Sequence, residues 1–141
     1  MEYADTCLLV SLFVRDSGTD AALTWLETSS IQPIRASHWS LTEFSSAAAL
    51  HARKGNISAR LHKEILARFR RFAHARLTLE PLQAGDFERA ATMTDRYVTG
   101  LRAADALHLA LCARLGLTLC TADKVIIAAA EACGVNARRI G

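Results

Sequence analysis

Short apolar segments alternate with longer amphipathic segments along the whole sequence, and this alternation restricts the possible folds strongly. The segments typical of strands are residues 2–4, 32–37, 76–82, 117–121 and 135–140. Those typical of helices are residues 6–14, 20–29, 37–54, 84–98, 102–116 and 123–134, together with one that begins near residue 56. Strands separated by helices form βαβ crossovers, which place a parallel sheet between covering helices. At 141 residues, the sequence predicts a single α/β domain over residues 1–141.

Particular residues indicate how two of these helices begin and pack. Thr6 precedes the first apolar periodic run, so its hydroxyl is expected to cap that helix. In the helix at 102–116, four residues recur at helical spacing: Ala104, Leu107, Leu111 and Leu115. This spacing predicts one apolar face directed at the core.

The absence of export signals indicates a cytoplasmic protein. A strand pattern begins almost at Met1, which leaves no room for a signal peptide. No apolar run reaches the roughly 18–20 residues that span a bilayer, so no membrane association is expected. The cysteines are scattered among apolar residues without a CxxC pair, at Cys7, Cys112, Cys120 and Cys133. We expect reduced thiols rather than disulfides or a zinc site.

One stretch of the chain is strongly basic. Residues 51–76 contain eight Lys and Arg residues and one acidic residue, a net charge of +7 that leaves −4 for the rest of the chain. Such asymmetry indicates a polyanionic partner for one surface. A solvated helix face in an arginine-rich protein has the same composition, and the sequence leaves both interpretations open.

Four acidic residues lie near the ends of predicted strands. In a doubly wound sheet, ligands bind beyond the carboxyl ends of the strands. Asp5 follows the first strand, and Asp123 follows the fourth and opens the next helix. Asp105 lies in the first turn of its helix, and Glu43 borders an apolar stripe of another. Each has a structural alternative, because acids are favoured at helix N-termini and on solvated faces.

These carboxylates need a cation if they converge. Two carboxylates about 4 Å apart repel by roughly 4 kcal/mol at an effective dielectric constant near 20. Mg²⁺ and Mn²⁺ bind oxygen ligands and often retain water, so either ion would stabilise such a cluster. A metal ion in this setting activates water and suits phosphoryl chemistry. The acids therefore predict Mg²⁺ or Mn²⁺ as cofactor.

Each of the four acids lies within a longer sequence segment, and these segments follow one another along the chain. These are YADT, LTEFSSAAALHARKGNIS, LRAADALHLALC and LTLCTADKVIIAAAEACGV, and the last two acids are 18 positions apart. Through these segments the whole chain resembles PIN-domain ribonucleases. Within that superfamily it most resembles the VapC-type toxins of bacterial toxin–antitoxin pairs. The resemblance implies a three-layer α/β/α fold with a mostly parallel sheet of about five short strands. It also implies a Mg²⁺- or Mn²⁺-dependent endoribonuclease, a homodimer, and silencing by a small cognate antitoxin.

The resemblance assigns the four acids to one catalytic pocket. Asp5, Asp105 and Asp123 would hold one or two metal ions. Glu43 would either complete the ligand shell or orient the water that attacks an RNA phosphodiester. The resemblance also implies that cleavage leaves RNA fragments with a 3′-hydroxyl and a 5′-phosphate. Basic residues of the stretch at 51–76 would contact flanking RNA phosphates without reading sequence, namely Arg60, Lys63, Arg68, Arg70 and Arg71.

Four further residues lie close to these acids in the sequence, and each has its own expected role. Thr6 and Thr121 match hydroxyl-bearing residues of the family and would support the site. Cys7 stands where the family commonly has serine, and because a thiol orders water or phosphate poorly, we leave it out of the site. His108 lies one turn beyond Asp105 in an apolar helix, and we interpret it as a packing residue rather than a ligand.

Two other functions are possible for such a sequence. A receiver-type signalling module also has acids at strand ends, but it needs an acid pair after its first strand and an aspartate after its middle strand. Here the first strand is followed by Asp5 alone, and QPIRASHWS contains no acid. A catalytically inert PIN-like module would bind RNA or a partner without cleaving, and Mn²⁺ titration would distinguish it from an enzyme.

Overall fold

A computed structural model of the chain describes residues 1–29 and 33–141. The described residues form five strands: β1 (Glu2–Ala4), β2 (Ile34–Ser37), β3 (Leu77–Glu80), β4 (Thr118–Thr121) and β5 (Ala137–Arg139). The helices are α1 (Thr6–Phe13), α2 (Thr19–Thr28), α3 (His38–Arg53), α4 (Ala59–Arg76), α5 (Ala84–Asp95), α6 (Ala103–Leu115), α7 (Lys124–Cys133) and the short 3₁₀ helix η1 (Tyr97–Thr99). Gln32, which the predicted second strand includes, lies outside the described residues. No helix in the described part of the chain is both long and apolar enough to cross a membrane.

The strands form one sheet in the order β3-β2-β1-β4-β5. Every pairing in it is parallel. In chain order, β2 and β3 are added on one side of β1, and β4 and β5 are then added on its other side. The direction of building therefore switches between β1 and β4, and the carboxyl ends of these two strands border the crevice where such sheets bind ligands.

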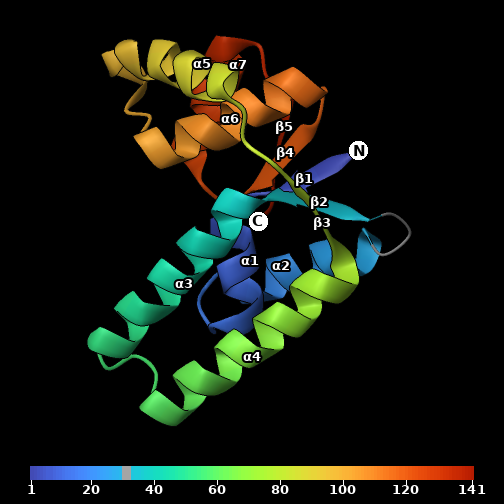
Figure 1. Cartoon of the computed structure of the whole chain (residues 1–141), viewed down its shortest axis with the longest axis vertical. Coiled ribbons are helices and arrows are strands. Elements are labelled where there is room, and N and C mark those ends of the chain that lie inside the picture. The colour runs from blue at the N-terminus through green and yellow to red at the C-terminus, as the bar shows by residue number, and fades with distance from the viewer. Residues whose placement is uncertain (30–32) are drawn as a thin grey trace.

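The helices cover the sheet in two layers (Figure 1). Helices α5, α6 and α7 lie against one face, and α1 to α4 lie against the other. Each layer has its own core of buried apolar residues, centred on α6 in the first layer and on α1, α3 and α4 in the second. The prediction of a three-layer α/β/α fold with a mostly parallel sheet of about five short strands is confirmed.

Helix α6 is more deeply buried than its sequence spacing predicts. All residues from Ala106 to Cys112 are buried, rather than a single face. The reason is that α6 lies between β-strand residues such as Tyr3 and the α5 residues Ala90 and Met93, so its opposite sides both contact protein. Both ends of the helix reach the surface, and its first turn carries the half-buried Asp105.

Aromatic packing fixes α3 against α4. The rings of Phe44 on α3 and Phe69 on α4 stack with their centroids 3.6 Å apart. Phe13 of α1 contacts both rings edge-on and also meets Phe72. Because Phe44 follows Glu43 directly in α3, this packing holds the backbone that carries Glu43.

Candidate active site

Strands β1 and β4 set the floor of the crevice. Ala4 pairs with Cys120 in the sheet, and the N–H of Asp5 donates to the carbonyl oxygen of Cys120 at 3.0 Å. This register brings Asp5, one residue beyond β1, beside Thr121 at the end of β4. Asp123 follows two residues later at the start of α7. The two strand-end acids are therefore placed by sheet register.

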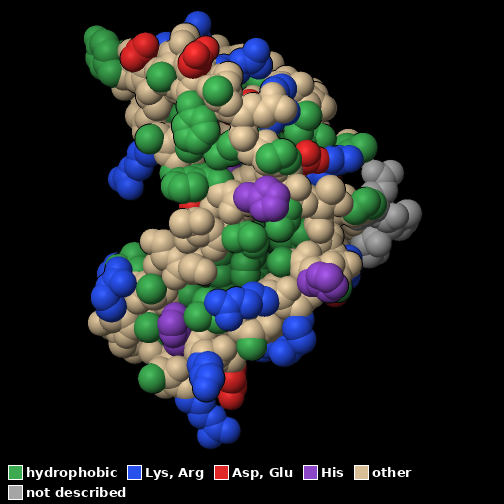
Figure 2. Space-filling model, in the orientation of Figure 1, with side chains coloured by type: hydrophobic (Ala, Val, Ile, Leu, Met, Phe, Trp, Pro, Cys, Tyr) green, Lys and Arg blue, Asp and Glu red, His purple; other side chains and the backbone are tan. Residues whose placement is uncertain are grey.

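All four predicted acids line one pocket of about 530 Å³. Asp5 reaches it from the end of β1, Glu43 from α3, Asp105 from the first turn of α6 and Asp123 from the start of α7. Helices α1 and α3 belong to one layer of the fold, whereas α6 and α7 belong to the other, and the surface in Figure 2 is indented between these two halves. The pocket lies where the layers meet beyond the sheet.

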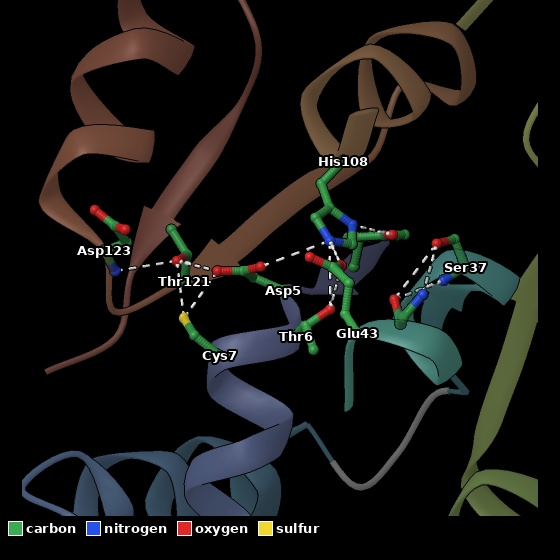
Figure 3. Close-up of polar contacts among 10 residues, drawn as sticks. Asp5, Thr6, Cys7, Ser37, Glu43, His108, Thr121 and Asp123 are labelled. Carbon is green, nitrogen blue, oxygen red and sulfur yellow. Dashed lines mark hydrogen bonds and ion pairs between the residues drawn. The ribbon is translucent and has the colours of Figure 1, made fainter. Parts of the chain in front are cut away.

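Asp5 is the most tightly held of these acids. Its side chain is buried, and its Oδ2 accepts hydrogen bonds from the Thr121 hydroxyl at 2.7 Å and the Cys7 thiol at 2.8 Å. Its Oδ1 lies 3.9 Å from Nε2 of His108. Figure 3 shows the carboxylate between Thr121 and Cys7 on one side and His108 on the other. The orientation of Asp5 is therefore fixed from both sides.

Cys7 lines the pocket as well, although its thiol is not among the residues that the sequence predicts for the site. Its sulfur lies 3.5 Å from the Thr121 hydroxyl in addition to its contact with Asp5, and the residue lines the pocket wall. Cys7 is exposed at this wall, but the desolvation of its thiol by surrounding groups, together with the charge of Asp5, raises the pKa of Cys7 to about 12. The sulfur is therefore protonated and acts as a donor to Asp5, a role that a serine hydroxyl would also fill.

Asp123 combines a structural contact with its place at the pocket. Its Oδ1 accepts a hydrogen bond from the N–H of Val125 at 2.7 Å, which caps α7. Its backbone N–H donates to the Thr121 hydroxyl at 3.0 Å. Thr121 thus connects Asp123 to Asp5, since the same hydroxyl donates to the Asp5 carboxylate.

Thr6 contacts Glu43 rather than capping α1. The predicted cap is wrong, because Asp5 occupies the N-cap position and Thr6 is already the first helical residue. The Thr6 hydroxyl donates to Oε1 of Glu43 at 2.8 Å. This contact joins α1 to α3 across the pocket.

His108 takes part in a polar network, so its interpretation as a packing residue is incomplete. The ring is 1% exposed, and both of its nitrogens have polar partners. Nδ1 lies 2.6 Å from the Tyr3 hydroxyl, and Nε2 lies 2.5 Å from Oε1 of Glu43. Burial lowers the pKa of His108, but the hydrogen bond to Glu43 and the charges of Asp5, Glu43 and Asp105 outweigh it and raise the pKa above its usual value.

The pKa of Asp105 reflects both its burial and the nearby charges of the other acids. Burial raises its pKa, and the negative charges of Asp5, Asp123 and Glu43 raise it further, whereas His108 lowers it, with a result of about 6. The usual pKa of this carboxyl group is 3.8. The charged form of Asp105 is therefore less favourable here than in water, and a cation in the pocket would stabilise it.

Asp105→Asn is expected to stabilise the metal-free protein at neutral pH. The folded state holds the Asp105 proton up to about pH 6 and the unfolded state only to about pH 3.8, so this group lowers stability as pH rises through that interval. Removing the charge should raise the free energy of unfolding by about 1–2 kcal/mol at pH 7, a value reduced for its half-buried position, and by little at pH 4. Urea unfolding in a chelator at both pH values measures this. The exposed Asp95→Asn is the control, and a pH-independent gain for Asp105→Asn would contradict the expectation.

The donor set fits a hard divalent cation that retains water. Asp5, Asp105 and Asp123 offer carboxylate oxygens, which suit Mg²⁺ and Mn²⁺. A cation would also offset the repulsion between the negative charge of Asp105 and those of the neighbouring acids. Within residues 1–29 and 33–141, no three His, Cys, Asp or Glu side chains stand close enough together to form a ready coordination shell. Mg²⁺ usually binds through one or two carboxylates and keeps several waters, so a pocket of this size accommodates it without such a shell.

The pocket also contains residues that the sequence did not single out. Asp16 and Ser17, in the turn after α1, line its outer part. Asp16 accepts hydrogen bonds from the Ser11 hydroxyl and the N–H of Gly18, so it orders this turn. The predicted RNA contacts lie elsewhere: all five are exposed on α4, and the described pocket lining includes none of them, namely Arg60, Lys63, Arg68, Arg70 and Arg71.

Comparisons with known proteins agree with this architecture. The sequence of residues 3–132 matches the PIN domain family. No protein with a curated description matches the sequence. The fold is similar to that in the crystal structure of VapBC2 from Rickettsia felis bound to a promoter DNA fragment, with a TM-score of 0.73, 17% identity and 100% of both chains covered.

Two further solved structures are similar. FitAcB from Neisseria gonorrhoeae has a TM-score of 0.72 and 19% identity, over 97% of this chain and 96% of that chain. VapC20 from Mycobacterium tuberculosis, named as a toxin that cleaves the sarcin–ricin loop, has a TM-score of 0.65 and 18% identity, over 84% of this chain and 87% of that chain. At these identities the likeness establishes a shared fold.

Proposed function

This chain belongs to the PIN domain family, and we propose that it is a divalent-metal-dependent endoribonuclease that acts in the cytoplasm as the toxin of a toxin–antitoxin pair. The observation that carries the proposal is the convergence of four acids from separate elements on one pocket: Asp5, Glu43, Asp105 and Asp123. Burial, and then the charges of the other three acids, raise the pKa of Asp105 to about 6, and a bound cation would offset both effects.

In the proposed mechanism, Asp5, Asp105 and Asp123 would hold Mg²⁺ or Mn²⁺, directly or through water. A bound ion of this kind supplies a more acidic water and neutralises charge on the leaving oxygen of an RNA phosphodiester. Thr121 fixes Asp5 and connects it to Asp123 through its hydroxyl. Glu43 lies at the partly exposed rim of the pocket, where it orients the attacking water and accepts its proton.

The exposed cations of α4 would bind RNA phosphates beside the pocket. Figure 2 shows Lys and Arg side chains over the lower half of the molecule, where Figure 1 places α3 and α4. Helix α4 packs on α3, which carries Glu43, so RNA held along α4 would approach the acids from that side. Such contacts position the RNA without selecting its sequence.

The toxin role rests on the structures that share this fold. These include VapBC2, FitAcB and a toxin–antitoxin complex from Klebsiella pneumoniae. By analogy, we propose that this protein is a homodimer and is silenced by a small cognate antitoxin.

Cleavage assays with metal control test the proposed activity. The purified protein is incubated with transfer, ribosomal and messenger RNA in Mg²⁺, in Mn²⁺ and in excess chelator. We expect endonucleolytic fragments in either metal and none in chelator, together with a rise in melting temperature on addition of Mn²⁺. Absence of both cleavage and Mn²⁺ stabilisation would instead identify a catalytically inert RNA- or partner-binding module.

A further inference from the structure

His108 is a polar side chain in a deeply buried helix. It lies in the middle of α6, between buried residues on both sides, and only 1% of it is exposed. A buried imidazole is costly unless its nitrogens are hydrogen-bonded. Here both nitrogens are bonded, and the two partners lie on different elements of the fold.

On the core side, Tyr3 fixes the ring. Tyr3 is fully buried in β1, and its hydroxyl lies 2.6 Å from Nδ1 of His108. The two rings are in contact, with centroids 5.6 Å apart. Burial raises the pKa of the Tyr3 hydroxyl above its usual value, so this group keeps its proton. Tyr3 therefore holds the His108 ring through both a ring contact and a hydrogen bond to Nδ1.

On the pocket side, the ring meets Glu43. A carboxylate can only accept, so Nε2 carries the proton in the contact with Oε1 of Glu43. The Thr6 hydroxyl donates to the same oxygen and lies 3.3 Å from Nε2. Both donors therefore hold Oε1, and neither of these contacts uses Oε2.

Two donors on one oxygen restrict the orientation of the Glu43 carboxylate. The Glu43 side chain keeps 19% of its surface exposed at the pocket, and the hydrogen bonds from His108 and Thr6 to Oε1 select one orientation of the carboxylate there. We propose that His108 is a positioning residue that orients the Glu43 carboxylate at the acidic pocket, with Tyr3 holding the ring for this task. This inference rests on the proposed function for its catalytic consequence.

Three substitutions separate positioning from packing. His108→Gln removes the ring but keeps a donor, Tyr3→Phe removes only the hydroxyl that fixes the ring, and Glu43→Gln removes the charge that His108 orients. The control is His74→Gln, at an exposed position on α4. We expect His108→Gln to lower kcat about 10- to 100-fold with little change in KM for RNA, as for other residues that orient a site. Tyr3→Phe should lower kcat by about two- to tenfold.

The double variant decides whether His108 acts through Glu43. If it does, His108→Gln combined with Glu43→Gln will be no slower than Glu43→Gln alone, because the group to be oriented is already lost. Losses that multiply in the double variant would overturn the proposal. Folded His108→Gln and Tyr3→Phe proteins that both keep wild-type kcat would also overturn it.

Ring spectra provide a readout that needs neither metal nor activity. In the metal-free protein, ¹H–¹⁵N spectra of the histidine rings should show the His108 nitrogens shifting in Glu43→Gln and in Tyr3→Phe, but not in His74→Gln. Unchanged His108 signals in Glu43→Gln would overturn the proposal. A wild-type protein that bound no Mn²⁺ and cleaved no RNA would end the proposed function, and the ring spectra would then decide alone whether His108 holds Glu43.

Discussion

Asp5→Asn is expected to reduce metal-dependent RNA cleavage by about 10²–10³-fold. Asn has nearly the same shape and still accepts hydrogen bonds from Thr121 and Cys7, so the local structure should persist. What is lost is the negative charge of the carboxylate that lies deepest in the pocket. Cleavage of RNA in Mn²⁺ and the dissociation constant of Mn²⁺ measure the two consequences of that loss.

The control for this prediction is Asp95→Asn, an exposed carboxylate at the end of α5. It makes the same chemical change away from the pocket and should leave both cleavage and Mn²⁺ affinity unchanged. Melting curves in chelator establish that Asp5→Asn is folded. A folded Asp5→Asn protein with full activity would show that the pocket is not the site of the chemistry.

The order of elements could be predicted because it depends on local patterns. Strand-length apolar segments and helical periodicity predict each strand and each α-helix in its observed order, and βαβ crossovers predict the parallel pairing. The predicted helix over residues 84–98 is too long, because α5 ends at Asp95 and the separate 3₁₀ helix η1 follows it. Burial was less predictable. The spacing in α6 indicated one apolar face, yet Ala106–Cys112 are buried on all sides, because small residues such as Ala106 and Ala110 let neighbouring elements approach the helix.

The acids could be predicted to share a crevice, whereas their partners could not. Asp5 and Asp123 follow strands, and the topology of doubly wound sheets brings such positions together. His108 gives no comparable signal, because its partners Tyr3 and Glu43 lie 105 and 65 positions away in the sequence. The chemistry of a thiol argues against a site role for Cys7, and only the structure shows that its sulfur lies within hydrogen-bond distance of Asp5.

Replacing three α4 arginines by glutamine is expected to weaken RNA binding about tenfold at moderate salt. Arg68, Arg70 and Arg71 are exposed, and glutamine keeps a similar helix propensity, so α4 should remain folded. Each lost phosphate contact to single-stranded RNA lowers the slope of log K against log salt by about 0.7, a total of about 2 for three contacts. Binding isotherms in chelator at several salt concentrations measure this slope without cleavage.

A matched variant separates the location of charge from its amount. Arg15 in the turn between α1 and α2, Arg89 on α5 and Arg139 on β5 are all exposed, and their replacement by glutamine removes the same net charge. If α4 binds the RNA, this control will keep its affinity within about twofold, and the α4 variant will raise KM while kcat stays unchanged, because its residues lie outside the pocket. Equal losses in both variants would mean that net charge, and not the α4 surface, attracts the RNA.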